Sequence, residues 1–376
     1  MIRVLNIQET IGSGGVERLR LSLAKFLDKR KFDLKIICTF SIGNIADEIR
    51  ENGVEVIEIG KFHSIFDFSQ HSKVRKIIAE FKPQIIHGAV FEGVTMAAIN
   101  GFITRVPVII IEETSDPKNR SWRGNLLMKV FSALAQKVVA VSPGVEEYLL
   151  HTLKLSERRV QLINNGVATP RFVSEAEIIK TRDSLGIRAG EVVIGSVGRM
   201  LHDAQKRFSD LIRAVPLLLA SGHKVKLLLV GDGPQRVIYE QLAAELGVEE
   251  QILFCGYQSD VAKYYSVMDI FSLVSAYEAF GLVLTEAMLH KIPVVATRVG
   301  GIKYIVEDKQ TGFLVEPLNV QQIAEQIQIL CSNLNLRRRM GSAGYEKAMI
   351  AYTEEGYVQQ VSDLYLSLTE RKISNG

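Results

Sequence analysis

The sequence predicts an α/β protein made of two doubly wound parallel sheets, and three observations support this class. Short apolar runs alternate with helical patterns along the whole chain, which is typical of parallel strands covered by helices on both faces. This pattern stops in a polar stretch between Ala168 and Gly190 and then restarts. The length of 376 residues exceeds what one core normally organises and suits two domains.

The first half of the chain holds the strands of the first expected domain. Each run is short, aliphatic and rich in β-branched residues, as buried strands are. The runs are Val4–Ile7, Leu34–Cys38, Val54–Ile59, Ile85–His87, Val106–Ile111, Val138–Val141 and Val160–Ile163. We expect them to form one sheet in a domain of residues 1–168.

The second half repeats this organisation after a linker that we place near residues 166–172, where Pro170 interrupts the chain. Its strand-like runs are Val192–Val197, Val225–Val230, Ile252–Phe254, Ile270–Val274, Pro293–Ala296 and Phe313–Val315. We expect a second domain of residues 169–353. The stretch Glu354–Lys372 has the pattern of a terminal amphipathic helix.

Composition places the chain among ordinary globular proteins, with 47% hydrophobic and 23% charged residues. No apolar run reaches the roughly 18 residues of a membrane-spanning helix, and residues 1–7 are too short for a signal peptide. Cys38, Cys255 and Cys331 are far apart and form no metal or redox motif. We therefore expect reduced thiols in a cytoplasmic protein.

The net charge of +3 is unevenly distributed. Residues 1–168 contain 23 Lys and Arg against 18 Asp and Glu, a difference of +5. A basic half suits either an anionic membrane surface or an ordinary solvated surface. The basic segment Lys118–Arg123 precedes an apolar helix and contains the sole Trp, while Arg20 and Lys25 belong to a basic set on the first helix. Basic residues are not interleaved with aromatic ones, so nucleic-acid binding is not expected.

The most informative stretch runs from Glu278 to Glu286 and includes Phe280-Gly281. It follows an apolar strand, so Glu278 lies in a loop at a strand's carboxyl end and Glu286 on the helix that starts near Gly281. Ligands of open α/β sheets bind at that edge. A glycine at a helix start lets backbone N–H groups approach a phosphate. This arrangement suits a nucleotide-sugar. The alternative is an ordinary surface helix whose two glutamates bind no ligand.

Cations follow the first predicted strand of the second half, Val192–Val197, in the same way. Arg199 comes after Val197-Gly198, and Lys206 follows in the next loop, with Arg207 as its rival. Fixed cations stabilise the charge that grows on a departing diphosphate. The chain has no Asp-x-Asp sequence, the usual ligand pair for a diphosphate-bound metal, so we expect no metal cofactor.

The glycines near the start require a comparison with dinucleotide-binding enzymes. Gly12, Gly14 and Gly15 follow a strand and open a helix, but Glu17 stands where the dinucleotide fingerprint needs Gly or Ala. A hydride-transfer enzyme is therefore disfavoured.

These motifs together resemble the retaining glycosyltransferases of family 4, which have the GT-B fold. The family hallmark Glu-x-Phe-Gly-x-x-x-x-Glu is present in full at residues 278–286. Weaker matches occur in the family's order at Gly14–Arg18, Val141-Ser142, Asn164–Val167, Val197–Arg199, Val230–Pro234 and Gly300-Gly301. The resemblance implies two Rossmann-like domains facing across a cleft, with residues 354–376 crossing back onto the N-terminal domain.

The resemblance also implies roles in the donor site. Arg199 and Lys206 would bind the diphosphate, Glu286 the ribose hydroxyls and Glu278 the transferred sugar. The other donor-site residues that it implies are Gly14, Gly15, Tyr257, Phe280, Gly281, Leu282 and Val283. The backbone N–H groups of the last three would face the phosphates. Tyr257 would lie beside the base, although a tyrosine at a strand end is also common for other reasons.

The family's reaction is metal-independent, retains configuration and needs no covalent intermediate on Glu278. His87 is the ambiguous candidate: relatives often carry a second His two residues later, and Ala89 stands there. His87 is thus either catalytic or structural. Glu112 and Glu113, which end a strand nearby, are alternative polar contacts.

The expected function is transfer of an N-acetylhexosamine from a UDP-sugar to a lipid-linked pyrophosphate glycan, in synthesis of bacterial surface polysaccharide or O-antigen. We expect the chain in the cytoplasm, with peripheral contact to the inner membrane. The alternatives are a UDP-sugar epimerase and a non-catalytic sugar-nucleotide-binding protein, which Ala89 keeps open.

Overall fold

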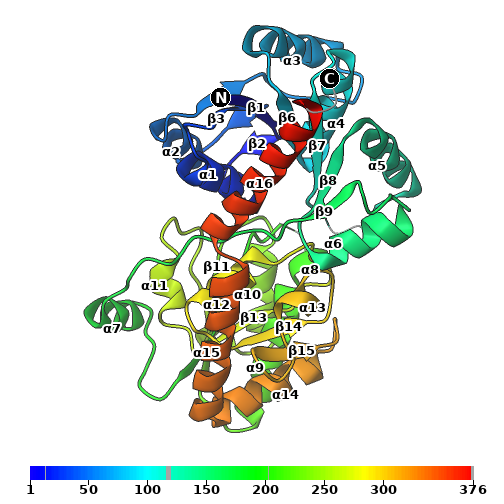
Figure 1. The fold of residues 1–376 in the computed structure, drawn as a ribbon. Helices are drawn as coiled ribbons and strands as arrows, with labels where there is room; N and C mark the ends of the chain where they lie inside the picture. The colour runs from blue at the N-terminus through cyan, green and yellow to red at the C-terminus, as the bar shows by residue number, and fades with distance from the viewer. Residues whose placement is uncertain (13, 116–119, 202, 374–376) are drawn as a thin grey trace. The chain divides into compact units, whose positions relative to one another are not determined.

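The computed structural model describes residues 1–12, 14–115, 120–201 and 203–373. Contacts within the chain divide it into two compact units, of which unit 1 comprises Met1–Gly166 with Thr353–Gly376, and unit 2 comprises Val167–Tyr352. Each unit contains one large parallel sheet with helices on both faces (Figure 1). The predicted fold class is confirmed.

Unit 1 has a seven-stranded sheet in the order β5-β3-β1-β6-β7-β8-β9, in which every pair is parallel. Its strands are β1 (Ile2–Ile7), β3 (Phe32–Cys38), β5 (Glu55–Glu58), β6 (Ile85–Ala89), β7 (Val108–Glu113), β8 (Lys137–Ala140) and β9 (Val160–Leu162). Two further strands of two residues each, β2 (Thr10–Ile11) and β4 (Phe40–Ser41), pair beside the sheet. The central strands are apolar and buried, as expected of strands covered on both faces.

Helices connect these strands, and several begin at a polar cap. The side chains of Asp67, Ser121 and Ser142 each accept a hydrogen bond from a backbone N–H of the helix that follows. The helices of unit 1 are α1 (Gly15–Phe26), α2 (Ile45–Glu51), α3 (Phe68–Phe81), α4 (Val90–Ile103), α5 (Trp122–Leu134), α6 (Pro143–Glu147) with a π-helical turn over Tyr148–Thr152, and α16 (Glu354–Ile373).

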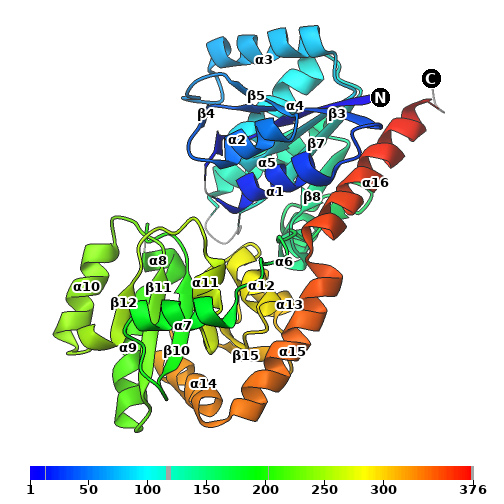
Figure 2. The ribbon, with the colours of Figure 1, turned by 90° about the vertical axis from the view of Figure 1, so that its left-hand side faces the viewer.

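Helix α16 belongs to unit 1 although it ends the chain, and it runs alongside α1 (Figure 2). Its inward face places Tyr357 and Tyr365 in the core of the unit, together with three aliphatic residues. At its start the Ser22 hydroxyl of α1 donates to Glu354 at 2.8 Å. The core of unit 1 is therefore completed by residues from the far end of the sequence.

Unit 2 has a six-stranded parallel sheet in the order β12-β11-β10-β13-β14-β15. Its strands are β10 (Val192–Val197), β11 (Val225–Val230), β12 (Ile252–Phe254), β13 (Ile270–Leu273), β14 (Val294–Thr297) and β15 (Gly312–Val315). The chain moves outward from β10 to one edge and then returns to the middle at β13, so β10 and β13 flank the point where the strand order reverses.

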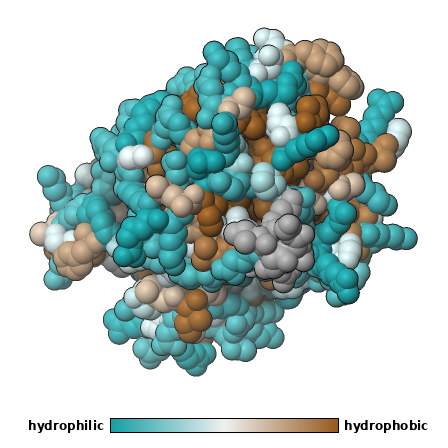
Figure 3. Space-filling view, turned by 45° about the horizontal axis from the view of Figure 1, so that its top comes forward, coloured by the Kyte–Doolittle hydropathy of each residue, from teal (hydrophilic) through white to brown (hydrophobic). Residues whose placement is uncertain are grey.

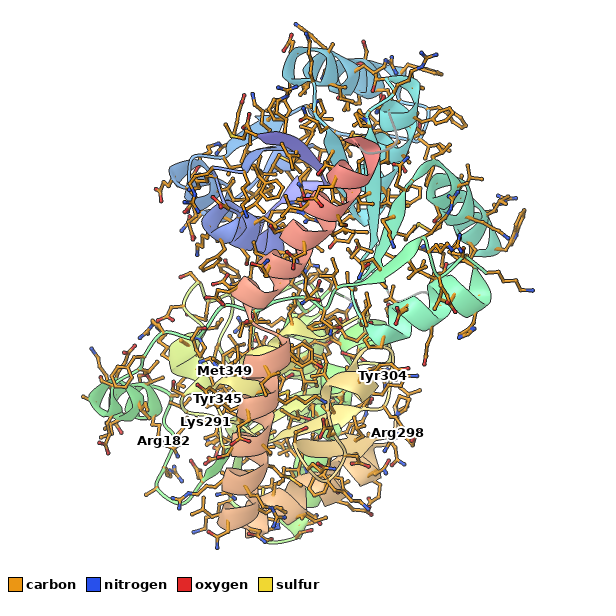
Figure 4. All side chains as sticks on the ribbon, in the orientation of Figure 1. Arg182, Lys291, Arg298, Tyr304, Tyr345 and Met349 are labelled. Atoms are coloured by element: carbon orange, nitrogen blue, oxygen red, sulfur yellow. The ribbon has the colours of Figure 1, made fainter. Side chains whose placement is uncertain are left out.

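Helices cover both faces of this second sheet and form two hydrophobic clusters with it. They are α7 (Glu175–Ser184), α8 (Asp203–Lys206), α9 (Phe208–Ala220), α10 (Arg236–Glu245), α11 (Ala262–Tyr265), α12 (Leu282–Leu289), α13 (Ile302–Ile305), α14 (Val320–Ser332) and α15 (Leu334–Ala351), with a 3₁₀ turn at Glu249–Gln251. Helix α15 packs against α12. Just after α12, the Lys291 ammonium lies 4.7 Å from the ring centroid of Tyr345 on α15 (Figure 4).

Candidate active site

The carboxyl ends of β10 and β13 in unit 2 form a topological switch point, the place where open α/β sheets bind their ligands. The loop after β10 carries Arg199 and leads to Lys206 on α8. The loop after β13 carries Glu278 and leads to Glu286 on α12. The sheet therefore delivers the predicted cations and carboxylates of unit 2 to one edge.

Lys206 and Glu278 form an ion pair at this edge. The Lys206 ammonium donates to Oε2 of Glu278 at 2.6 Å, and the side chains are only 19% and 15% exposed. The two loops are also joined through their backbones, since the Ala276 N–H donates to the Gln205 carbonyl at 2.8 Å. A cation and a carboxylate are thus held together in a mostly covered position.

The rival cation Arg207 points to different partners. Its guanidinium pairs with Asp210 at 2.6 Å and with Asp203 at 3.3 Å. Asp203 also accepts a hydrogen bond from the Tyr239 hydroxyl at 3.0 Å. Arg207 therefore joins α8 to α9. The structure brings Lys206 rather than Arg207 to Glu278.

Arg199 follows β10 directly and is exposed. Among the residues that the structure describes, it has no ion-pair partner. Its guanidinium is accordingly available at the switch point for an anion. Fixed cations that lack a protein partner can bind a diphosphate through charge-assisted hydrogen bonds.

Glycines let the loops after β10, β11 and β12 approach closely. Gly231 and Gly233 have φ values of +127° and +154°, which favour glycine. A Cβ on Gly231 would collide with the carbonyl of Gly198. The Gly231 N–H donates to the Gly256 carbonyl at 2.8 Å, and Tyr257, next along the chain, has an exposed side chain. Tyr257 is thereby presented to solvent from the loop after β12.

The start of α12 is open at its backbone. Gly281 precedes the helix with φ +108°, and within the described part of the chain no side chain caps the helix. The first N–H groups of a helix, here those of Leu282 and Val283, have no acceptor within the helix. Phe280 itself is buried against Tyr352, with ring centroids 5.6 Å apart. Its side chain therefore packs in the core, and only its backbone belongs to the open loop.

Glu286 lies further along α12, and its carboxylate has a partner that sequence reasoning missed. The Tyr265 hydroxyl donates to Oε2 of Glu286 at 2.7 Å. Tyr265 is fully buried on α11, twenty-one residues earlier in the chain. No local signal in the sequence marks this tyrosine, because the contact arises only when α11 and α12 pack together.

Gly14 and Gly15 belong to unit 1, where they open α1 beyond the carboxyl end of β1. Gly14 is the N-cap, and a Cβ there would collide with the carboxylate of Glu17. The side chain of Glu17 thus folds back over the start of the helix, where the helix dipole favours a negative charge.

His87 lies inside unit 1. It is fully buried on β6, and its Nδ1 is 2.8 Å from the Tyr365 hydroxyl of α16. Its Nε2 is 3.8 Å from Oε2 of Glu112, which is itself buried and paired with Arg20. The expectation that Arg20 contributes to a basic surface is wrong, because the Arg20 side chain is fully buried and bonds to Gln8 after β1, to Glu112 of β7 and to Tyr357 of α16. These groups form a buried polar network that joins α16 to the sheet.

The second strand-end carboxylate is also paired. Glu113 is buried on β7 and accepts hydrogen bonds from Arg120, one of them at 2.9 Å. Both glutamates therefore have cationic partners within unit 1.

The burial of His87 predicts a pH dependence of unit 1. Burial lowers the pKa of His87 from 6.5 to about 4, so the folded form holds a neutral imidazole while the unfolded chain binds a proton below pH 6.5. Unit 1 should therefore lose stability as the pH falls from about 6.5 to 4. Hydrogen exchange of β6 and α16 peptides should accelerate over this range, and His87→Gln should flatten the dependence. A slope that is equally steep in the variant would contradict the assignment to His87.

The side chains and helices can also be compared with the requirements of a metal site and of a membrane span. Among the described residues, no group of three or more His, Cys, Asp and Glu side chains is arranged to bind a metal ion. None of the helices in the described residues is long and apolar enough to cross a membrane.

Comparison with protein families gives two adjoining matches. Residues 13–171 match the model described as Glycosyltransferase Family 4, and residues 177–347 match the model described as Glycosyl transferases group 1. The two models meet near the boundary between the units and together cover most of the chain.

Individual relatives agree with these families. The chain is 31% identical over 215 residues to N-acetyl-alpha-D-glucosaminyl L-malate synthase of Bacillus anthracis, covering 57% of this chain and 55% of that protein. It is 29% identical over 239 residues to a lipopolysaccharide core biosynthesis glycosyltransferase of Rhizobium meliloti, covering 62% and 64%. The matched part of the chain thus spans less than two thirds of the length of either relative.

A solved structure shares the complete fold. The crystal structure of Anabaena HepE in complex with UDP-glucose superimposes with a TM-score of 0.84 at 23% identity, covering 98% of this chain and 100% of that one. At this level of identity the likeness establishes the fold and leaves the ligand to be argued from the site.

Proposed function

The chain belongs to the family 4 glycosyltransferases, and from this premise we propose that it transfers a sugar from a UDP-sugar to a glycan acceptor with retention of configuration. The observation that carries the proposal is the Lys206–Glu278 pair beside the open start of α12. One ligand with both a diphosphate and a sugar would satisfy the cations, the helix start and the carboxylate together.

The chemistry follows from where charge develops. As the bond between the sugar and the diphosphate breaks, negative charge grows on the phosphate oxygens. This charge would be stabilised by Arg199, Lys206 and the first N–H groups of α12. Because the charge is greatest in the transition state, these groups would stabilise the transition state more than the bound donor. Glu278 would accept hydrogen bonds from hydroxyls of the transferred sugar. The leaving phosphate would accept the acceptor's proton, so this scheme requires no protein base.

Relatives narrow the proposed substrates. The names of the Bacillus and Rhizobium proteins refer to an N-acetylglucosaminyl product and to lipopolysaccharide core synthesis, and HepE was solved with UDP-glucose. We propose an N-acetylhexosamine as the transferred sugar and a lipid-linked pyrophosphate glycan as the acceptor, in synthesis of a bacterial surface polysaccharide or O-antigen.

Donor binding is the first test. We expect one UDP-sugar from a panel of UDP- and GDP-sugars to raise the melting temperature in EDTA, because Arg199 and Lys206 supply the positive charge in place of a metal. Glu286→Gln should weaken this stabilisation without lowering the melting temperature of the free protein. Glu240→Gln, on the exposed face of α10, is a matched control. Stabilisation that appears only after Mg²⁺ is added would contradict metal-independent binding of the donor.

Turnover separates a transferase from a protein that only binds nucleotide-sugars. Incubation with the selected UDP-sugar and a lipid-linked glycan acceptor should release UDP and extend the glycan. Binding without either product would favour the non-catalytic alternative. Conversion of the donor into an isomeric UDP-sugar would favour an epimerase.

A lipid-linked acceptor requires access to a membrane, and α5 of unit 1 has a suitable surface. Trp122, Leu126 and Val130 are 71%, 55% and 48% exposed and follow at intervals of four residues, so they form one outward stripe. Arg123 and Lys129 are exposed on either side of it, and the Arg123 guanidinium lies 5.4 Å from the Trp122 ring centroid. Figure 3 shows hydrophobic side chains exposed among hydrophilic ones on the face that it presents.

An apolar stripe with basic flanks suits the surface of an anionic bilayer, where apolar side chains enter the interface and cations meet the head groups. Helix α5 contains no acidic residue that would oppose this contact. Lys118, which belongs to the same basic segment of the sequence, lies outside the described residues. We propose that unit 1 binds the cytoplasmic face of the inner membrane through α5.

Vesicle binding tests this surface. Vesicles of phosphatidylglycerol and phosphatidylcholine should bind the protein and shift the fluorescence of Trp122, the only Trp, to shorter wavelength. Leu126→Gln should weaken binding several-fold. Ile179→Gln changes an apolar residue of similar exposure on α7 of unit 2 and should have no effect. Equal binding by both variants would contradict the role of α5.

A further inference from the structure

We propose that Tyr265 is a positioning residue for Glu286 and that the pair makes the site selective for ribonucleotides over 2′-deoxyribonucleotides. This inference rests on the proposed function, in which the Glu286 carboxylate binds the ribose of the donor. It adds a residue on a different helix, which orders the Glu286 carboxylate and thereby strengthens the preference for a ribose.

The contact between the two side chains is direct. The Tyr265 hydroxyl donates to Oε2 of Glu286 at 2.7 Å and lies 3.3 Å from the Val283 carbonyl one turn earlier on α12. The Tyr265 ring is fully buried and contacts Phe271 of β13, with ring centroids 5.8 Å apart. A hydroxyl on a ring that cannot move is a fixed donor, and it holds one oxygen of Glu286 in a defined place.

His290 also packs against the tyrosine. Its ring stacks on that of Tyr265, with centroids 4.7 Å apart and planes 24° from parallel. Its Nδ1 lies 2.8 Å from the Glu286 carbonyl, and because a carbonyl can only accept, Nδ1 carries the hydrogen. Burial lowers the pKa of His290, so the ring is neutral at pH 7. The stack therefore fixes the tyrosine through packing and places no cation beside Glu286.

The chemistry of the ribose explains why orientation matters. A carboxylate is an acceptor only, and its two oxygens match the two neighbouring hydroxyls of a ribose. Glutamate has three rotatable side-chain bonds, and ordering them upon binding costs entropy. The hydrogen bond from Tyr265 orders the carboxylate before the nucleotide arrives. A nucleotide without the 2′-hydroxyl would lose one of the two hydrogen bonds and would gain little from this order.

Titration with UDP and 2′-deoxy-UDP tests the inference. Loss of one hydrogen bond to a charged group predicts that the wild-type protein prefers UDP by about tenfold or more. Tyr265→Phe keeps the ring and removes the hydroxyl. It should weaken UDP binding about three- to tenfold, change 2′-deoxy-UDP binding little, and bring the ratio of the two affinities towards one.

Two controls separate positioning from packing. Tyr264→Phe removes a hydroxyl from the neighbouring buried tyrosine of α11 and should leave the ratio unchanged. In a double-mutant cycle with Glu286→Gln, Tyr265→Phe should have little further effect on UDP binding, because the tyrosine acts through the carboxylate.

The outcomes distinguish this inference from the proposed function. If Tyr265→Phe weakens both nucleotides equally, or leaves the ratio at its wild-type value, Tyr265 has a structural role only and the inference is wrong while the donor site stands. If the wild-type protein binds neither nucleotide, both the inference and the proposed donor site are wrong.

Discussion

Replacing Lys206 with alanine is expected to lower the rate of sugar transfer about 100-fold or more, with a smaller effect on donor binding. Lys206 is mostly covered and lies at the switch point, 2.6 Å from Glu278. In the proposed reaction the charge on the diphosphate is greatest in the transition state, so a fixed cation there stabilises the transition state more than the bound donor. The measurement is UDP release under saturating donor.

Arg207 provides the control for this experiment, because it is the adjacent residue with the same charge. Its guanidinium pairs with Asp203 and Asp210, so Arg207→Ala should lower the melting temperature while leaving the rate of the folded enzyme within a few-fold of wild type. The reverse result, a slow Arg207 variant and an active Lys206 variant, would transfer the role to Arg207. If both variants are as active as the wild-type enzyme, neither Lys206 nor Arg207 stabilises the transition state and this part of the proposed mechanism is wrong.

The parallel sheets were predictable because a buried strand leaves a strong local signal. Strands covered on both faces read as continuous apolar runs, and all of the predicted runs in both sheets form strands of the structure. The short strands Thr10–Ile11 and Phe40–Ser41 were missed, since two residues carry no periodicity. The start of α12 lies one residue later than predicted, because Gly281 is its cap rather than its first residue.

The members of the candidate site could be named from the sequence only where they share a loop or a motif. The sequence indicated Glu278, Glu286 and Arg199 because each follows a recognisable strand. It left Lys206 and Arg207 as alternatives, since which of two adjacent cations faces Glu278 depends on how α8 turns against Asp203. Tyr265 could not be found, because its contact with Glu286 joins two helices whose packing the sequence does not state.

Unit 1 shows the same limit more strongly. A basic residue on an amphipathic helix is normally exposed, and nothing near Arg20 in the sequence indicates the carboxylate that pairs with it. That carboxylate, Glu112, lies 92 residues later on β7, and the Tyr357 hydroxyl 3.4 Å from Arg20 comes from α16. His87 joins this network through Tyr365. Long-range pairing of polar residues decides their burial, and composition or spacing cannot reveal it.

Replacing Glu112 with alanine is therefore expected to destabilise unit 1 by about 3–5 kcal/mol. Arg20 is fully buried, and without Glu112 its positive charge would remain in the core of the unit with only neutral partners, the Gln8 amide oxygen and the Tyr357 hydroxyl. Because a chain of two units need not unfold in one step, the free energy should be measured unit by unit. Hydrogen exchange should accelerate in β7, α1 and α16 peptides and remain unchanged in those of unit 2.

Matched variants show whether the unpaired charge is the cause. Glu113→Ala removes the next carboxylate on β7, but its partner Arg120 is 19% exposed, against 0% for Arg20, and keeps a hydrogen bond to Ser115, so the loss should be clearly smaller than that of Glu112→Ala. The double variant Arg20→Met with Glu112→Leu removes both charges and should recover most of the lost stability. If the double variant is as unstable as Glu112→Ala, the unpaired charge of Arg20 is not the cause of the loss.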